Sequence, residues 1–153
     1  SGVRGIRLKG DDVVVEASSI PHPEVSELLV VMENGLGKST PVTLYRFQGR
    51  GGSGVKAAQL TKKTGDIVGG CVLEQGAEGD LVCISKQGQT IRMRLSDIPS
   101  RGRATQGVIV MRLDDGDTVA SMSVVMHDPN ASTFTGAETE ESVEQSLFDE
   151  EQA

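Results

Sequence analysis

Residues 28–55 read LLVVMENGLGKSTPVTLYRFQGRGGSGV, and residues 81–108 read LVCISKQGQTIRMRLSDIPSRGRATQGV. The second stretch lies on the first without a gap at an offset of 53 residues, so that Arg50 corresponds to Arg103. An internal repeat of this length is typical of solenoids and propellers, in which each repeat folds into one unit and packs on its neighbour. The repeat therefore indicates the architecture before any single residue is interpreted.

Two short motifs recur three times around these stretches. The first motif is Gly-Val, four further residues and Leu, and the second is Gly-Asp-x-Val a few residues later. Such glycine-containing motifs indicate turns between short strands. The copies of the first motif are residues 2–8, 54–60 and 107–113, and those of the second are residues 10–13, 65–68 and 116–119.

The segment NGLGKST (34–40) matches the second half of a phosphate-binding loop, G-x-x-x-x-G-K-[ST]. The first glycine of that motif is missing, because its position holds Met32. The repeat places QGQTIRM at the same position, and apolar, β-prone runs flank both segments. Asn-Gly between such runs predicts a hairpin turn, because both residues tolerate positive φ. A nucleotide-binding enzyme that depends on Lys38 remains a minor alternative.

The repeat predicts an all-β fold of propeller-like blades, each with four antiparallel strands, in a partial array of about two and a half blades. No window shows helical periodicity. The predicted strands lie near residues 28–33, 40–46, 55–60 and 67–73 in one blade, near 81–85, 90–95, 108–113 and 119–125 in the next, and near 2–8 and 13–18 in the N-terminal part.

The negative charge is concentrated at the C-terminal end. The chain has a net charge of −7, but residues 137–153 hold seven acidic residues and no basic one, whereas residues 1–136 hold fifteen of each. Such a block predicts a disordered acidic tail. No apolar run approaches the ~18 residues of a membrane span, so no membrane partner is expected. Cys71 and Cys83 lack a metal-type spacing, and we expect reduced thiols and no metal site.

The chain resembles the C-terminal domain of the DNA gyrase A subunit, the β-pinwheel domain of type IIA topoisomerases. The resemblance covers residues 1 to about 126 and rests on the motifs GVRGIRL, ENGLGKST, RGGSGV, QTIRMRLSDI, GRATQGV and Gly-Asp-x-Val in matching order. It implies strand exchange between neighbouring blades. It also implies four units: the end of a preceding blade (1–27), a blade (28–79), the last blade (80–128) and a disordered acidic tail (129–153).

The resemblance implies a module that binds and wraps double-stranded DNA and has no catalytic residue of its own. The parent enzyme would introduce negative supercoils together with the gyrase B subunit, using ATP and Mg²⁺ held by other domains or by that other subunit. A cytoplasmic, nucleoid-associated location follows from the same resemblance. The acidic tail favours gyrase over the topoisomerase IV A subunit, which stays an alternative, as does a propeller-like scaffold that binds proteins.

The resemblance also points to one loop, QGRGGSG (48–54), which is similar to the Q-R-R-G-G-K-G box of gyrase. The loop departs from the box at Gly49 and Ser53, where the family has basic residues, and it lies in a later blade than the box does. The matching residues are Gln48, Arg50, Gly51, Gly52 and Gly54.

Wrapping of DNA requires basic side chains that contact phosphates along an outer rim. Low aromatic content (3 %) argues against stacking on single strands, so the duplex backbone is the expected target. Lys38, Arg50, Arg92 and Arg103 rank first because they recur at or beside equivalent repeat positions. The predicted DNA-binding residues are Lys38, Arg46, Arg50, Lys56, Arg92, Arg94, Arg101 and Arg103.

Overall fold

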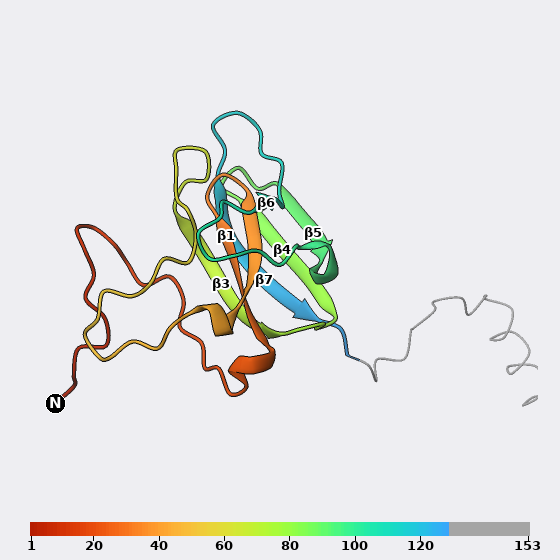
Figure 1. Cartoon of the computed structure of the whole chain (residues 1–153). Coiled ribbons are helices and arrows are strands. Elements are labelled where there is room, and N and C mark those ends of the chain that lie inside the picture. The colour runs from red at the N-terminus through yellow and green to blue at the C-terminus, as the bar shows by residue number, and fades with distance from the viewer. Residues whose placement is uncertain (129–153) are drawn as a thin grey trace, which may run out of the picture.

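The computed structural model describes residues 1–128, in which two antiparallel sheets are joined by turns, three single-turn 3-10 helices and longer irregular segments such as residues 45–66 (Figure 1). One sheet has the strand order β3-β1-β2-β6 and the other has the order β5-β4-β7. The all-β, blade-like fold predicted from the repeat is confirmed. The strands are β1 (Ser26–Met32), β2 (Leu36–Pro41), β3 (Ile67–Glu74), β4 (Gly79–Ser85), β5 (Thr90–Arg94), β6 (Val108–Ile109) and β7 (Val119–Met126), and the 3-10 helices are η1 (Pro23–Val25), η2 (Val42–Leu44) and η3 (Leu95–Asp97).

The opening segment 34–40 forms the predicted hairpin between β1 and β2. The two strands are antiparallel, with Val30 opposite Lys38, and the Gly35 N–H donates to the carbonyl of Met32 over 3.0 Å. Only the glycine has a positive φ, of 80°, so the turn needs the permissive backbone of one residue and not of both. The expected strand 40–46 starts earlier than predicted and stops at Pro41, where η2 begins.

The second repeat builds the same hairpin from β4 and β5. Cys83 lies opposite Ile91, which is the pairing of Val30 with Lys38 moved by 53 residues. The third strands also correspond, since β3 pairs with β1 and β7 pairs with β4. Each repeat is therefore a three-stranded unit in which the first strand lies in the middle.

The fourth strand of the first sheet comes from the second repeat. β6 pairs with β2, with Val108 opposite Gly37 and Ile109 opposite Leu36. The chain thus passes from the second sheet back to the first and returns to the second for β7 (Figure 1). This is the strand exchange implied by the gyrase resemblance, and it corrects the expectation that each repeat supplies all four of its own strands.

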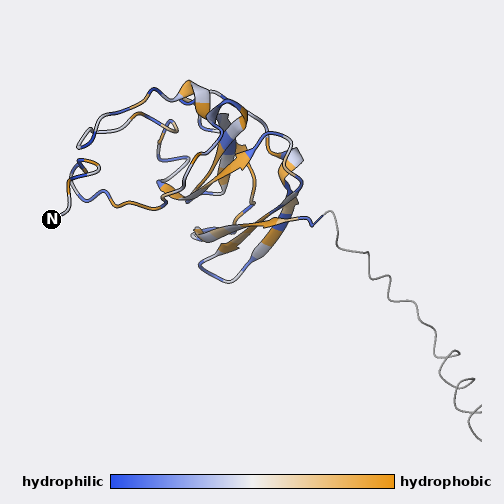
Figure 2. Cartoon of the chain, turned by 90° about the horizontal axis from the view of Figure 1, so that it is seen from below, coloured by the Kyte–Doolittle hydropathy of each residue, from blue (hydrophilic) through white to orange (hydrophobic). Residues whose placement is uncertain are grey.

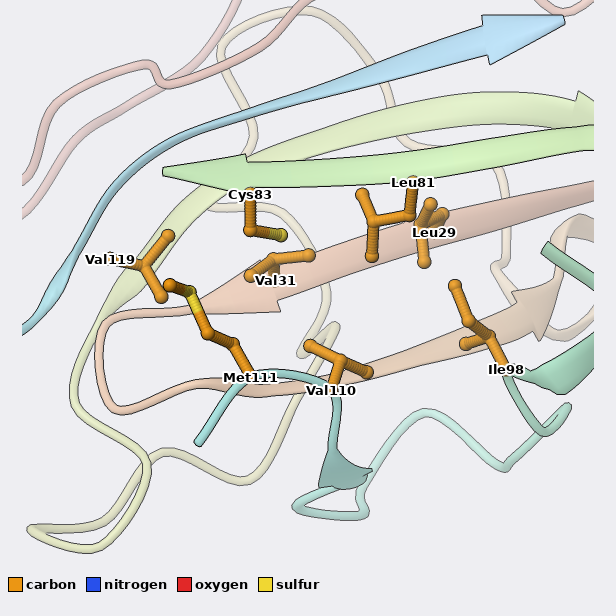
Figure 3. Close-up of a cluster of buried hydrophobic side chains, with 8 residues drawn as sticks. All are labelled: Leu29, Val31, Leu81, Cys83, Ile98, Val110, Met111 and Val119. Carbon is orange, nitrogen blue, oxygen red and sulfur yellow. The ribbon is translucent and has the colours of Figure 1, made fainter. Parts of the chain in front are cut away.

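The core fills the space between the two sheets. Leu29 and Val31 of β1 meet Leu81 and Cys83 of β4, and all four side chains are at most 1 % exposed (Figure 3). At the repeat offset of 53 residues, Leu81 and Cys83 correspond to residues 28 and 30 of β1, and not to the core residues Leu29 and Val31. Adjacent residues of a strand point to opposite faces. The two repeats therefore present opposite faces to their common interface, and they stack front to back.

The predicted strands at 2–8, 13–18 and 55–60 are wrong. These segments hold no strand, and residues 1–21 are exposed throughout. Figure 2 shows the chain near the N-terminus as an irregular trace beside the sheets. The equivalent segments of the later repeats, β6 and β3, pair with strands that lie earlier in the chain. Within residues 1–128 no strand pairs with residues 2–8, 13–18 or 55–60, so their backbone groups lack the neighbour that would make them strands.

Candidate nucleic-acid interface

Two equivalent loops carry four of the eight predicted DNA-binding residues. We call residues 46–54 the first Gly/Arg loop and residues 99–107 the second Gly/Arg loop. Each follows the single-turn helix after its hairpin, and each ends at the glycine that begins a Gly-Val motif. The repeat thus explains why basic residues recur at these places.

The first Gly/Arg loop lies along the N-terminal segment (Figure 1). The Gly51 N–H donates to the carbonyl of Gly5 over 2.9 Å, and the Arg7 N–H donates to the carbonyl of Gly52 over 2.8 Å. Gly51 and Gly54 have φ values of 70° and 80°, which L side chains rarely adopt. The box-like glycines therefore fix the course of this loop, and a contact with DNA by the box-like residues stays a prediction.

The second Gly/Arg loop is fastened to the first sheet by backbone and side-chain hydrogen bonds. The Ser39 N–H donates to the carbonyl of Pro99 over 3.2 Å, and the Arg101 N–H donates to the carbonyl of Ser39 over 2.8 Å. The Glu27 carboxylate accepts one bond from the Ser39 hydroxyl and one from the Ser100 hydroxyl, each 2.8 Å long. These bonds hold the start of the loop against β1 and β2.

The structure corrects the expectation for Lys38, which is completely buried (0 % exposed). Its ammonium group donates to the carbonyls of Gly102 (2.7 Å) and Arg103 (2.6 Å) and to the hydroxyl of Thr105 (3.2 Å). Burial, with a smaller contribution from the charge of Arg103, lowers the pKa of Lys38. Lys38 therefore contacts neither solvent nor a phosphate, and the nucleotide-binding alternative loses the lysine on which it depends.

The other basic residues of the two loops reach the surface. Arg103 is half-buried; its guanidinium lies 5.8 Å from the centre of the Tyr45 ring and donates to the Lys56 carbonyl over 3.2 Å. This arginine joins the second Gly/Arg loop to the segments on either side of the first. We call this set of cations the basic edge and define it by Arg46, Arg50, Lys56, Arg101 and Arg103, of which all but Arg103 are exposed.

The sequence around the basic edge contains no acidic residue. Residues 34–65 hold six basic and no acidic residues, and residues 98–113 hold three basic and none acidic. A positive surface of this kind attracts the phosphate backbone without reading its sequence. The sequence at the edge is thus basic although the net charge of the whole chain is negative, and the acidic residue that approaches the second Gly/Arg loop from β1 is Glu27, bonded to Ser39 and Ser100.

The remaining predicted arginines, Arg92 and Arg94, lie on β5 and not on the loops. The Arg92 guanidinium pairs with the Asp80 carboxylate, which also lies 2.9 Å from the Nε2 atom of His127. Hydrogen bonds from His127 and Arg92 lower the pKa of Asp80. Asp80 therefore neutralises much of the charge of Arg92, and a phosphate contact by Arg92 or Arg94 stays a prediction.

Sequence reasoning missed the part played by His127 in this cluster. Asp80 and His127 are 47 residues apart and come together only because β4 pairs with β7. The equivalent strand pairings place Gln75 at the corresponding position of the first repeat, since the Gln75 N–H bonds to the Val25 carbonyl as the His127 N–H bonds to the Glu78 carbonyl, so the periodicity carried no signal for a histidine there.

A pocket of about 600 Å³ opens between the two sheets, where β3 ends and β4 begins. Three carboxylates line it, those of Glu27, Glu74 and Glu78, together with the Arg94 guanidinium and the His127 ring. Anionic ligands such as nucleotides are repelled by such a lining. Within residues 1–128 no group of three or more His, Cys, Asp or Glu side chains is arranged to hold a metal ion. The described part of the chain also contains no helix long and apolar enough to cross a membrane.

Comparison with known proteins identifies the family. The model of the DNA gyrase C-terminal domain, described as a β-propeller, matches residues 1–21, 26–70 and 79–126. The chain belongs to this family. The gyrase resemblance drawn from the repeat motifs is therefore confirmed. The match includes both Gly/Arg loops and omits residues 127–153.

Curated relatives agree with the gyrase family. The chain is 42 % identical over 125 residues to the DNA gyrase A subunit of Staphylococcus epidermidis (strain ATCC 12228 / FDA PCI 1200), an alignment that covers 82 % of this chain and 14 % of the relative. It is 41 % identical over 133 residues to the same subunit of Staphylococcus aureus (strain NCTC 8325 / PS 47), covering 87 % of this chain and 15 % of the relative. The chain thus spans about one seventh of the length of these relatives.

Solved structures share the fold. A DNA gyrase A C-terminal domain superposes with a TM-score of 0.58 at 26 % identity, covering 65 % of this chain and 33 % of that one. The C-terminal domain of a DNA topoisomerase IV superposes with a TM-score of 0.71 at 26 % identity, covering 80 % of this chain and 37 % of that one. The fold is therefore common to the gyrase and topoisomerase IV domains, whereas the two staphylococcal relatives are gyrase subunits.

Proposed function

We propose that this chain binds and bends double-stranded DNA as part of the C-terminal domain of a gyrase A subunit. The observation that supports the proposal is the basic edge, whose cations come from two repeats, are exposed apart from Arg103, and have no acidic residue in the flanking sequence, with Arg103 linking the second Gly/Arg loop to Tyr45 and Lys56 on either side of the first. Lys and Arg side chains that neutralise phosphates release condensed counterions, and the additional phosphate contacts of a bent duplex offset the cost of bending. Binding through the backbone requires no readout of base sequence.

The parent enzyme in this proposal is an ATP-dependent type II topoisomerase that introduces negative supercoils. Cleavage and rejoining of DNA belong to other parts of that enzyme, and ATP and Mg²⁺ belong to other domains or to the gyrase B subunit. The chain itself contributes the surface over which DNA bends. A cytoplasmic, nucleoid-associated location follows from the same proposal.

The predicted acidic tail lies outside the described residues, and we propose a role for it from its charge alone. Residues 137–153 hold seven acidic residues. A negative segment near a basic edge competes with phosphates for the same cations, and the competition weakens as salt screens both. Removal of residues 137–153 is therefore expected to tighten DNA binding at low salt.

The test is the affinity of the full chain, and of residues 1–136, for a duplex of about 150 base pairs, close to one persistence length. Affinity is measured by fluorescence anisotropy across a salt series. Steep salt dependence supports the basic edge, and tighter binding by residues 1–136 supports competition by the tail. Absence of binding by either chain at low salt, with the fold verified by circular dichroism, would instead favour the protein-binding scaffold.

A further inference from the structure

Lys38 is a cation held by neutral partners inside the protein. A buried ammonium group is costly unless its hydrogen bonds are satisfied. The three hydrogens of the group find three oxygen acceptors, two carbonyls and one hydroxyl, at distances of 2.6–3.2 Å. A carboxylate partner would neutralise the charge, but no ion pair of Lys38 occurs within the described residues. The three bonds therefore satisfy buried oxygen acceptors as well as the ammonium group.

All three acceptors belong to the second Gly/Arg loop, which is otherwise poor in packing side chains. Gly102, Arg103 and Thr105 supply them, and the Thr105 hydroxyl in turn donates to the Gly102 carbonyl over 2.8 Å. The Gln59 N–H then donates to the Thr105 carbonyl over 3.0 Å. The ammonium group thus draws the Gly102 and Arg103 carbonyls and the Thr105 hydroxyl of this turn inward.

Two arginines of the basic edge lie in this turn or beside it. The Arg103 carbonyl accepts from Lys38, while the Arg103 side chain lies over the Tyr45 ring and reaches the Lys56 carbonyl. Arg101 is exposed and is tied to Ser39, the neighbour of Lys38 on β2. A shift of the main chain at 102–105 therefore moves both guanidinium groups.

The repeat supplies an independent comparison. The position equivalent to Lys38 in the second repeat is Ile91 on β5, a partly buried side chain packed against the apolar core. Within residues 1–128 no later loop covers β5 as the second Gly/Arg loop covers β2. Ile91 packs on the apolar core between the sheets, whereas Lys38 is covered by polar groups of the second Gly/Arg loop.

We propose that Lys38 is a positioning residue for DNA binding, which fixes the second Gly/Arg loop from inside so that Arg101 and Arg103 face the phosphates. The inference rests on the proposed function. Lys38 does not touch DNA, and its effect on affinity passes entirely through the two arginines.

The first readout is amide hydrogen exchange of the full chain, measured residue by residue with NMR. Lys38→Met keeps an unbranched side chain of similar length and removes the three hydrogen bonds. The Arg101 and Gln59 amides, which report the two ends of the loop, are expected to lose protection at least tenfold more than amides in β4. Equal protection in the variant and the unsubstituted chain overturns the positioning role.

The second readout is a double-mutant cycle for binding of the 150-base-pair duplex. Removal of one phosphate contact lowers the slope of log affinity against log salt by about 0.9, which is roughly fifteenfold in affinity at 50 mM salt relative to 1 M. In the otherwise unsubstituted chain, Lys38→Met is expected to lower affinity by as much as the loss of one to two phosphate contacts. In a chain that already carries Arg101→Gln and Arg103→Gln, Lys38→Met is expected to leave the affinity unchanged. A coupling of this kind is a property of residues that act through one another.

Lys56→Met is the matched control, because Lys56 is an exposed lysine of the same edge. Its effect is expected to add to that of the arginine substitutions. An additive effect of Lys38→Met overturns the inference. If Lys38→Met does not fold, Thr105→Val, which removes one acceptor, replaces it in both readouts. Absence of duplex binding by the unsubstituted chain overturns the proposed function and the DNA part of this inference, while hydrogen exchange still decides whether Lys38 holds the loop.

Discussion

The glycine of the first hairpin allows the contact between the repeats to be measured separately from the turn itself. Gly35 has a φ of 80°, and a Cβ at this position would lie 2.1 Å from the Met111 carbonyl oxygen. The Gly35 carbonyl also accepts from the Val110 N–H (2.8 Å) and the Met111 N–H (3.0 Å). Gly35→Ala therefore strains the backbone and also pushes the two repeats apart.

The equivalent glycine of the second hairpin, Gly88, supplies the control. Its φ is 89°, and a Cβ there meets nothing within 4 Å. Alanine in the left-handed region costs about 1–2 kcal/mol, which is the whole expected effect of Gly88→Ala. Relief of the clash at Gly35 breaks two hydrogen bonds worth about 1 kcal/mol each, and it also loosens packing between the sheets. We expect Gly35→Ala to exceed Gly88→Ala by about 2–3 kcal/mol.

The measurement is urea unfolding of both variants, followed by far-ultraviolet circular dichroism. Parallel loss of stability in Gly35→Ala and Gly88→Ala would refute the reasoning, because it would mean that the first turn does not carry the contact between the repeats. A loss confined to Gly35→Ala would also contradict it, since both turns require a positive φ.

Three further outcomes follow from the same structure. Because the pKa of Asp80 is lowered in the folded chain, its ionisation adds stability above its unfolded pKa of about 3.9, and this stability is lost as the pH falls through the folded pKa. Asp80→Asn should therefore flatten the decline of urea midpoints below pH 4, and an unchanged decline would contradict this. Burial raises the pKa of Cys83 to about 11, so little of this thiol is ionised at pH 8. In Cys71→Ser, which leaves Cys83 as the reacting thiol, the folded chain should react with a disulfide reagent at pH 8 roughly two-hundredfold more slowly than the unfolded chain. Comparable rates would show the thiol to be accessible. Arg50→Gln should lower the salt slope for the duplex by about 0.9, and an unchanged slope would remove Arg50 from the basic edge.

The repeat predicted the hairpins because their information is local. An apolar, β-prone run, a glycine turn and a second run specify a hairpin without reference to the rest of the chain. The register is also repeated, since Val30 opposite Lys38 becomes Cys83 opposite Ile91. The offset of 53 residues therefore carried both the strands and their pairing.

The destination of the exchanged strand could not be read from the residues alone. β6 has only two paired residues, and its Gly-Val motif is the same as that of residues 54–60, which form no strand. What differs is the presence of β2 as a neighbour for β6. Such pairing is a non-local property, so two segments with the same Gly-Val motif differ in structure when one has a partner strand and the other has none.

The candidate site was predicted from composition and repeat position, and the prediction was wrong for the residue that the fold buries, Lys38. Arg50 and Arg101 reach the surface as the loops predict, but Lys38 does not. The pattern on β2 is uninformative, because five consecutive residues from Leu36 to Thr40 are buried and show no alternation of polar and apolar side chains. Only the arrival of the second loop, from 64 residues away, makes the lysine internal.

The exchanged strand has a mechanical consequence. Three connections of the chain pass between the two sheets, after β3, after β5 and after β6. Tension applied to one sheet is therefore transmitted to the other through covalent backbone as well as through side-chain contacts. In an array built this way, a load spread along several repeats does not open the boundaries between them one at a time. A surface against which a stiff duplex is curved must withstand the elastic recoil of that duplex, and interlocked repeats resist it without rigid helices or disulfide bonds.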